Sequence, residues 1–348
     1  MLKPDDRIAI FMHTGLKGGK GKTGISLLRY SRNEIVAVID ETAAGESITA
    51  LTGLDRDVPI VRSVEAAIAL NPTVLAIGLA PSGGTLPEPW YREVKQAVGA
   101  GLSVMNGLHT QMNEDAQLRS LIRPGCWVWD IRKEPQGLRV GGGRALALPC
   151  DRVLTVGTDM AVGKMSTSIE LTKASQSKGR KSKLIATGQT GLMLGEDGVA
   201  LDAVRVDYAA GAVEQCGVRH GNDHDILFVE GQGSLLNPGS TATLPLLRGT
   251  QPTHLILVHK AGLTHIQHFP DFRIPPLSKV VELYESAVRA AGTFPETRVA
   301  GIALNTFGLN EKEARLAIAA ASEETNLPCT DVVRFGAEPL LAAIFGAS

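Results

Sequence analysis

The amino-acid sequence predicts an α/β protein with two parallel-sheet domains. Short runs of β-branched and aliphatic residues alternate with helical segments along the chain, which is typical of parallel strands joined by crossover helices. The chain has 348 residues, of which 44% are hydrophobic. Because one core rarely organises so long a chain, we expect two cores.

The first half of the chain reads as alternating strands and helices. The expected strands are residues 8–12, 35–39, 74–78 and 103–105, and the expected helices are residues 63–70 and 89–100. In the second helix Val94, Ala97 and Val98 recur at helical spacing. This order predicts a Rossmann-like domain.

A Gly-rich, polar stretch at residues 135–144 is typical of a linker between compact units. We therefore place the domain boundary at 145, with an N-terminal domain over residues 1–145 and a C-terminal domain over residues 146–348.

The second half begins with a βαβ pattern. The expected elements are a strand at 153–156, a loop at 157–166, a helix to 175, a strand at 183–187, further strands at 226–229, 254–258 and 299–304, and a helix at 311–325. A strand that leads through a Gly-rich loop into a helix is the context of a phosphate-binding loop. The C-terminal domain is therefore predicted to be P-loop NTPase-like.

Gly157 and Gly163 let backbone N–H groups approach a phosphate, and Lys164 would neutralise its charge. Five residues separate the two glycines, and Met165 stands where a hydroxyl residue usually follows the lysine. If Mg²⁺ is used, the hydroxyl of Ser166 or Thr167 would hold it. The residues expected to bind the cofactor through this loop are Gly157, Thr158, Gly163, Lys164, Met165, Ser166 and Thr167.

A second polar feature is Glu230, which ends the apolar strand at 226–229 and begins the Gly-rich turn at 231–233. An acidic residue at this place in a P-loop fold reaches a metal ion or its water. Asp159 and Glu230 are our candidates for a catalytic base or a metal ligand, because the two loops should converge.

These two segments resemble the dethiobiotin-synthetase-like branch of P-loop proteins, which has the same five-residue spacing. Asn305, at the end of the strand 301–304, is similar to the asparagine that contacts the nucleotide base there. That branch carries a substrate-binding Lys-Pro on its second strand, whereas this chain has Ala186 and Thr187 followed by a Gly-rich turn. The resemblance therefore implies nucleotide binding more strongly than ligase activity.

A resemblance over nearly the whole chain is to the DgcN-type D-glutamate N-acetyltransferase family, long an uncharacterised-domain family. The stretches that carry it are residues 21–24, 27–30, 107–109, 157–166, 187–191, 202–208 and 230–234. It implies transfer of acetyl from acetyl-CoA to the amine of D-glutamate or a similar amino acid, with a pathway link to a racemase or epimerase. The loop and Asn305 would then hold the phosphates and adenine of CoA.

Acyl transfer to an amine also needs oxyanion donors and groups that hold the substrate. Backbone N–H groups of the turns at 188–191 or 231–233 are candidate oxyanion donors. Arg205, Gln189 and His109 are candidate substrate-binding residues, with Arg205 as a carboxylate clamp or, alternatively, an ordinary surface arginine.

The segment Gly15–Gly24 contains a GxGxxG match and three lysines, and Asp40 follows the second strand. A dinucleotide site, an anion site and a solvated loop are all compatible with this pattern. The first strand ends about six residues too early for the usual dinucleotide fingerprint.

The formal net charge is -1 and no basic cluster is present, so we expect a small-molecule substrate rather than nucleic acid or a membrane surface. The four scattered cysteines have no zinc-site spacing, and no apolar run reaches the roughly 18 residues that span a bilayer. We expect a cytoplasmic protein that forms a homo-oligomer.

Two other functions fit the same motifs. One is an ATP- and Mg²⁺-dependent kinase or ligase that acts on a small carboxylate, supported by Lys164, Ser166 and Glu230. The other is a module that senses nucleotides without catalysis. ATP turnover without acetyl-CoA would favour the first, and tight binding without turnover would favour the second.

Overall fold

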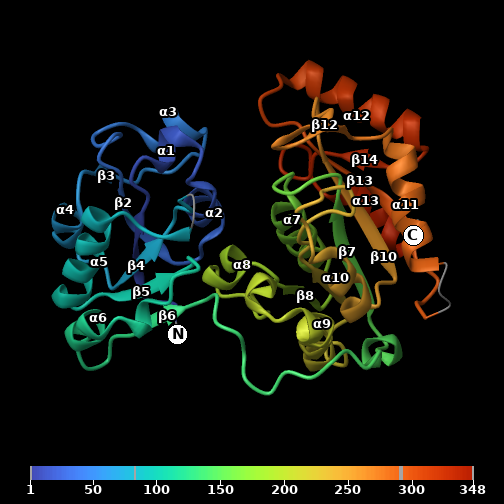
Figure 1. Ribbon diagram of the computed structural model, residues 1–348. Helices are drawn as coiled ribbons and strands as arrows, with labels where there is room; N and C mark the ends of the chain where they lie inside the picture. The colour runs from blue at the N-terminus through green and yellow to red at the C-terminus, as the bar shows by residue number, and fades with distance from the viewer. Residues whose placement is uncertain (1, 82–83, 290–292, 347–348) are drawn as a thin grey trace. The chain divides into compact units, whose positions relative to one another are not determined.

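The computed structural model describes residues 2–81, 84–289 and 293–346, and the chain forms two compact units. The N-terminal unit comprises Met1–Glu134 together with Gln189–Glu196, and the C-terminal unit comprises Pro135–Gly188 and Asp197–Ser348. Figure 1 shows a separate sheet with flanking helices in each unit. The predicted α/β class with two parallel sheets is confirmed.

The N-terminal unit contains a six-stranded parallel sheet in the order β3-β2-β1-β4-β5-β6. Its strands are β1 (Arg7–Phe11), β2 (Glu34–Ile39), β3 (Ile60–Val61), β4 (Val74–Ile77), β5 (Ser103–Asn106) and β6 (Val128–Asp130). Its helices are α1 (Gly15–Gly18), α2 (Lys22–Tyr30), α3 (Ile48–Thr52), α4 (Val64–Ile68), α5 (Glu88–Ala100), α6 (Ala116–Leu121), α8 (Gln189–Met193) and the short 3₁₀ helix η2 (Met112–Glu114). This strand order is the Rossmann order, which confirms the predicted Rossmann-like domain.

The ligand crevice of a Rossmann sheet normally opens where the strand order reverses, here between β1 and β4. In this unit helix α2 packs closely against the end of β4, because the N–H of Gly24 donates to the carbonyl of Gly78 at 2.8 Å. A Cβ on Gly78 would lie 2.9 Å from the Cα of Gly24. The buried carboxylate of Asp40 accepts backbone N–H groups of Thr14 and Leu16, so it fixes the loop after β1 instead of facing a ribose.

The C-terminal unit contains a second six-stranded parallel sheet in the order β14-β13-β10-β7-β9-β8. Its strands are β7 (Asp151–Gly157), β8 (Ser182–Ile185), β9 (Ile226–Val229), β10 (His254–Lys260), β13 (Arg298–Asn305) and β14 (Cys329–Thr330), with a separate antiparallel hairpin of β11 (His265–Ile266) and β12 (Phe269–Arg273). Its helices are α7 (Lys164–Ser177), α9 (Val206–His220), α10 (Thr243–Thr250), α11 (Leu277–Arg289), α12 (Glu311–Thr325) and α13 (Glu338–Phe345), with the 3₁₀ helices η3 (Arg144–Ala147) and η4 (Leu201–Ala203).

The central strands of this sheet are buried on both faces, as parallel strands covered by helices require. All four residues of β9 are buried, and β7 is buried after its first residue. The carboxyl end of β7 is therefore held firmly at the edge where ligands bind in open α/β sheets.

The Gly-rich stretch predicted as a linker is fixed against α9 of the C-terminal unit. Its Gly142 and Arg144 donate to the buried carboxylate of Glu214. A Cβ on Gly211 would lie 1.8 Å from the carbonyl oxygen of Arg139. This unit therefore begins at Pro135, eleven residues before the expected first residue at 146.

Across the three described ranges, no helix combines the length and apolar character that crossing a bilayer would require.

Candidate functional site

The loop between β7 and α7 presents a row of unused backbone donors. Ala161 and Gly163 have φ angles of 56° and 120°, and Lys164 begins α7. Within the described ranges, the N–H groups of residues 161–166 donate no hydrogen bond. Convergent N–H groups at a helix N-terminus bind anions, so this loop has the geometry of a phosphate site.

Lys164 lies buried against this loop, with 6% of its surface exposed. Its Nζ donates to the main-chain oxygen of Asp159 at 2.7 Å. A Cβ on Gly157 would lie 3.0 Å from this nitrogen, so the absence of a side chain at Gly157 makes room for the end of the lysine side chain. Burial lowers the pKa of Lys164 to about 8, against the opposing charges of Asp159 and Glu230.

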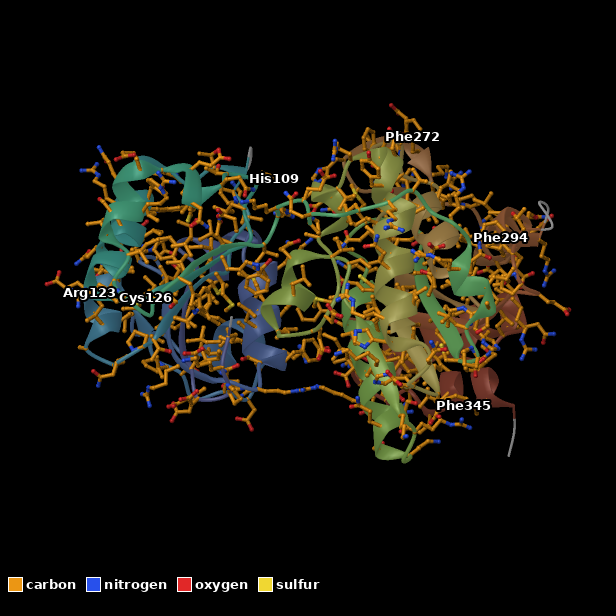
Figure 2. The ribbon with its side chains drawn as sticks, turned by 90° about the horizontal axis from the view of Figure 1, so that it is seen from below. His109, Arg123, Cys126, Phe272, Phe294 and Phe345 are labelled. Atoms are coloured by element: carbon orange, nitrogen blue, oxygen red, sulfur yellow. The ribbon has the colours of Figure 1, made fainter. Side chains whose placement is uncertain are left out.

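Asp159 ties three segments of the C-terminal unit together. Its buried carboxylate accepts from the N–H of Met160 at 2.7 Å, from Nδ2 of Asn237 at 2.7 Å and from the N–H of Gln267 at 2.6 Å. Gln267 belongs to the β11–β12 hairpin, whose Phe272 is labelled in Figure 2. Because both oxygens already accept hydrogen bonds, this geometry suits a positioning role for Asp159.

Replacing Asp159 with asparagine is therefore expected to lower the free energy of unfolding by roughly 1–3 kcal/mol, since hydrogen bonds to a charged acceptor are lost. Thermal denaturation measures this change. Asp271→Asn, on the exposed face of the same hairpin, is the matched control and should change little. Unaltered stability in Asp159→Asn, together with lost activity, would instead support a base.

Glu230 follows β9, and in the part of the chain that the structure describes only one of its two carboxylate oxygens accepts hydrogen bonds. Its Oε2 accepts from the N–H of Thr187 at 3.0 Å and of Gly188 at 3.2 Å. Among the described residues its Oε1 has no hydrogen-bond partner. Burial raises the pKa of Glu230, with these two N–H groups and the charge of Lys164 acting in the opposite direction.

Glu230 and the phosphate loop lie close together, as the sequence predicts. A Cβ on Gly231 would lie 2.9 Å from Cδ of Lys164, and the charges of Lys164 and Glu230 shift each other's pKa. The structure thus places a buried carboxylate with a free oxygen beside a buried cation and a row of N–H donors.

Asn305 lies at the end of β13 and contacts the loop. Its Nδ2 donates to the carbonyl of Val162 at 3.0 Å, and its Oδ1 accepts from the N–H of Phe307 at 3.0 Å. Thr158 faces the other way, since its buried hydroxyl is 2.8 Å from Nδ1 of His259 on β10. Burial lowers the pKa of His259 to about 4, so this histidine is neutral at pH 7.

The predicted hydroxyl ligands of a magnesium ion, Ser166 and Thr167, do not occupy the position directly after the lysine, where such a ligand usually lies. Met165 occupies the position after the lysine, and the hydroxyl of Thr167 donates to the carbonyl of Gly163 at 3.1 Å. Ser166 lies one position after Met165 and is half-buried. In the described chain no group of three or more His, Cys, Asp or Glu side chains is arranged to hold a metal ion.

Of the three predicted substrate-binding residues, Gln189 and His109 belong to the N-terminal unit and Arg205 belongs to the C-terminal unit. Gln189 belongs to the N-terminal unit, where its Oε1 accepts from Arg132 at 3.0 Å. His109 is exposed on the loop after β5 of the same unit (Figure 2). Arg205 is exposed at the start of α9, with its guanidinium 4.8 Å from the ring of Tyr208.

Sequence reasoning gave no role to Asn237, Gln267 and His259, which contact site residues, or to the side chain of Gln232, which approaches Gly188. The first two are bound to Asp159 across 78 and 108 positions of the chain, so no local pattern could have identified them. Gln232 lies inside the Gly-rich turn after Glu230, and its place in that turn was the one available signal.

Comparisons with known proteins agree with this architecture. Residues 139–341 match a family model described as the P-loop domain of DUF1611, a domain of unknown function, and residues 41–134 match its Rossmann-like N-terminal domain. A crystal structure of a DUF1611 family protein from Anabaena variabilis is 57% identical, with a TM-score of 0.96 over 98% of this chain and 99% of that one.

Two curated relatives carry a functional name. A protein from Tritonibacter scottomollicae named D-glutamate N-acetyltransferase is 34% identical over 81% of this chain and 84% of its own. A protein of the same name from a Pseudoalteromonas species is 32% identical over 80% and 83%. The chain therefore belongs to the DUF1611 family, which joins a Rossmann-like N-terminal domain to a C-terminal P-loop domain.

Proposed function

We propose that this protein transfers an acetyl group from acetyl-CoA to the amine of D-glutamate or a similar amino acid. The names of the two relatives support this reaction. The structural observation that carries it is the free oxygen of Glu230, a buried carboxylate beside the phosphate loop. A base of raised pKa is what proton removal from an amine requires.

The phosphate loop would bind the diphosphate of CoA. The free N–H groups of residues 161–166 point to such an anion, and Lys164 would exchange the carbonyl of Asp159 for a phosphate oxygen. Asn305, held to the loop through Val162, would lie near the adenine. Together these contacts would anchor the donor, so that its thioester reaches Glu230.

In the reaction the substrate ammonium first loses a proton to Glu230. The nitrogen lone pair then attacks the thioester carbonyl carbon, a C–N bond forms and the carbonyl electrons move to oxygen. When the tetrahedral intermediate collapses, the C–S bond breaks and CoA leaves as a thiolate. The nitrogen loses its second proton as it becomes an amide, and the thiolate takes up that proton. Every step is ordinary acyl transfer by general acid–base catalysis.

The oxyanion of that intermediate needs two donors. The N–H groups of Gly188 and Gly231 are already used by Glu230 and Thr155. The N–H groups of Gln232 and Gly233 have no partner in the part of the chain that the structure describes. The 231–233 turn directly follows Glu230, so we propose its N–H groups as the donors.

The affinity for acetyl-CoA is expected to fall as the pH rises above about 8, where free Lys164 loses its charge. Bound phosphate favours the charged lysine, so below that pH the affinity should be constant. Above it the dissociation constant should rise by up to roughly tenfold per pH unit, because binding must include proton uptake. Calorimetric titration from pH 7 to 9.5 tests this. Lys164→Met should abolish the slope.

The direct test incubates the purified protein with acetyl-CoA and either D- or L-glutamate. Thiol release is followed, and the product mass is measured. N-acetylglutamate formed from D-glutamate supports the proposal. Absence of any acetylated product across a panel of amino acids refutes it, and ATP consumption with Mg²⁺ and a carboxylate would then identify a kinase or ligase.

A further inference from the structure

The side chain of Gln232 reaches over Gly188 in the C-terminal unit. A Cβ on Gly188 would lie 2.3 Å from Nε2 of Gln232 and 3.2 Å from Oε1 of Glu230. Both side-chain ends therefore lie within 3.2 Å of the same point. Gly188 does not have a positive φ, so its lack of a side chain serves this close approach and not an unusual backbone conformation.

Both side-chain ends lack partners. Gln232 and the Oε1 oxygen of Glu230 make no side-chain hydrogen bond within the described ranges. Neither is sealed from solvent, since the fully enclosed unpartnered side-chain atoms in those ranges are Tyr30 Oη, Thr250 Oγ1 and Gln251 Oε1. An acceptor and an amide donor thus face one accessible point.

This pair of groups selects a particular ligand chemistry. The carboxylate of Glu230 repels an anion at its own position and attracts an amine or ammonium group. The amide N–H groups of Gln232, close beside it, suit a carboxylate oxygen. An α-amino acid carries these two groups on one carbon atom.

We propose that Glu230 and Gln232 form the acceptor subsite, in which Oε1 of Glu230 binds the amino group and the amide of Gln232 binds the α-carboxylate. This assignment rests on the proposed function and makes Gln232 a specificity residue. An amine without an α-carboxylate leaves the amide unpaired, and an unpaired polar group in a half-buried site costs binding energy.

Gln232 thereby takes the substrate-binding role that the sequence suggested for Gln189. The side-chain oxygen of Gln189 is already held by Arg132. Gln232 also lies next to Glu230, so that a bound α-carboxylate places the amine at the proposed base.

The test compares D-glutamate with 4-aminobutanoate, which keeps the amine and the distal carboxylate but lacks the α-carboxylate. For the wild-type protein we expect kcat/KM to favour D-glutamate by at least about 100-fold. In Gln232→Leu this preference should shrink to below roughly tenfold, mainly through a higher KM for D-glutamate. The KM for acetyl-CoA should stay within about twofold in the variant.

Two further variants separate binding from folding. Gln215→Leu makes the same chemical change on a half-buried part of α9 and should keep the wild-type preference. The added Cβ of Gly188→Ala would lie 2.3 Å from the flexible end of Gln232 and 3.2 Å from Oε1 of Glu230, and it would meet no backbone atom at close range. The variant should therefore fold, displace the amide and reproduce the loss of preference.

The outcomes are distinct. Wild-type turnover of D-glutamate with an unchanged preference in Gln232→Leu overturns this assignment and leaves the acetyltransferase proposal standing. No acetylated product from any amino acid with the wild-type protein overturns both. Loss of preference in Gln232→Leu and Gly188→Ala, with Gln215→Leu unaffected, supports the subsite.

Discussion

Replacing Lys164 with methionine is expected to reduce kcat/KM for acetyl transfer by about 100- to 1,000-fold, because a charged, water-excluded contact to the donor phosphates is lost. The same change should stabilise the ligand-free protein. Burial holds the pKa of Lys164 at about 8 rather than 10.5, which corresponds to a penalty on the order of 3 kcal/mol for the charged form.

Steady-state kinetics and thermal denaturation of the two proteins measure these opposite effects. Lys178→Met, at the exposed carboxyl end of the same helix, is the matched control and should change neither quantity appreciably. If Lys164→Met lowered both stability and activity, the lysine would be a structural residue, and the role in phosphate binding would be wrong.

Replacing Glu230 with glutamine is expected to lower kcat by about 100- to 10,000-fold, the range for loss of a general base. Glutamine keeps one oxygen to accept the N–H groups of Thr187 and Gly188, so the turn should keep its shape. It replaces the free oxygen by an amide nitrogen that cannot take a proton. The affinity for acetyl-CoA should therefore be retained.

The pH profile gives a second measurement of Glu230. A base must be deprotonated, so kcat/KM should rise with pH through the pKa of Glu230. Since burial raises this pKa, the rise should occur above the ordinary range for glutamate, and it should vanish in Glu230→Gln.

Glu214→Gln offers a control with the same chemistry at another buried carboxylate. Glu214 holds the backbone at Gly142 and Arg144, so this variant should lose stability and retain the pH profile. Equal loss of kcat in the two variants would contradict a specific role for Glu230.

Much of the fold could be predicted because its signals are local. Apolar runs mark β7, β9 and β10, and the helix over 311–325 agrees with α12, whose Asn310 and Glu313 form a capping box. The two-residue strands β3 and β14 were not predicted, since two residues carry no periodicity. Strand β6 (Val128–Asp130) was also missed, since its three residues are too short a run to show a strand pattern.

The site could be predicted less completely, because its roles depend on contacts between distant segments. The motif located Lys164 and Glu230 near each other, and the structure agrees. The motif could not show that the carboxylate of Asp159 is committed to Asn237 and Gln267. Nor could it distinguish Gln189 from Gln232. The side chain of Gln189 accepts a hydrogen bond from Arg132, whereas the side chain of Gln232 makes no hydrogen bond within the described residues.

Residues 189–196 belong to the N-terminal unit, although the chain on either side of them belongs to the C-terminal unit. The chain crosses between the units after Glu134, after Gly188 and after Glu196, so no single cut separates them. A fragment that ends at Glu134 lacks helix α8, including the Thr190 hydroxyl that lies 3.3 Å from that of Thr23. The two halves are thus not interchangeable modules, and a functional exchange between relatives would have to transfer this short insertion together with the N-terminal half.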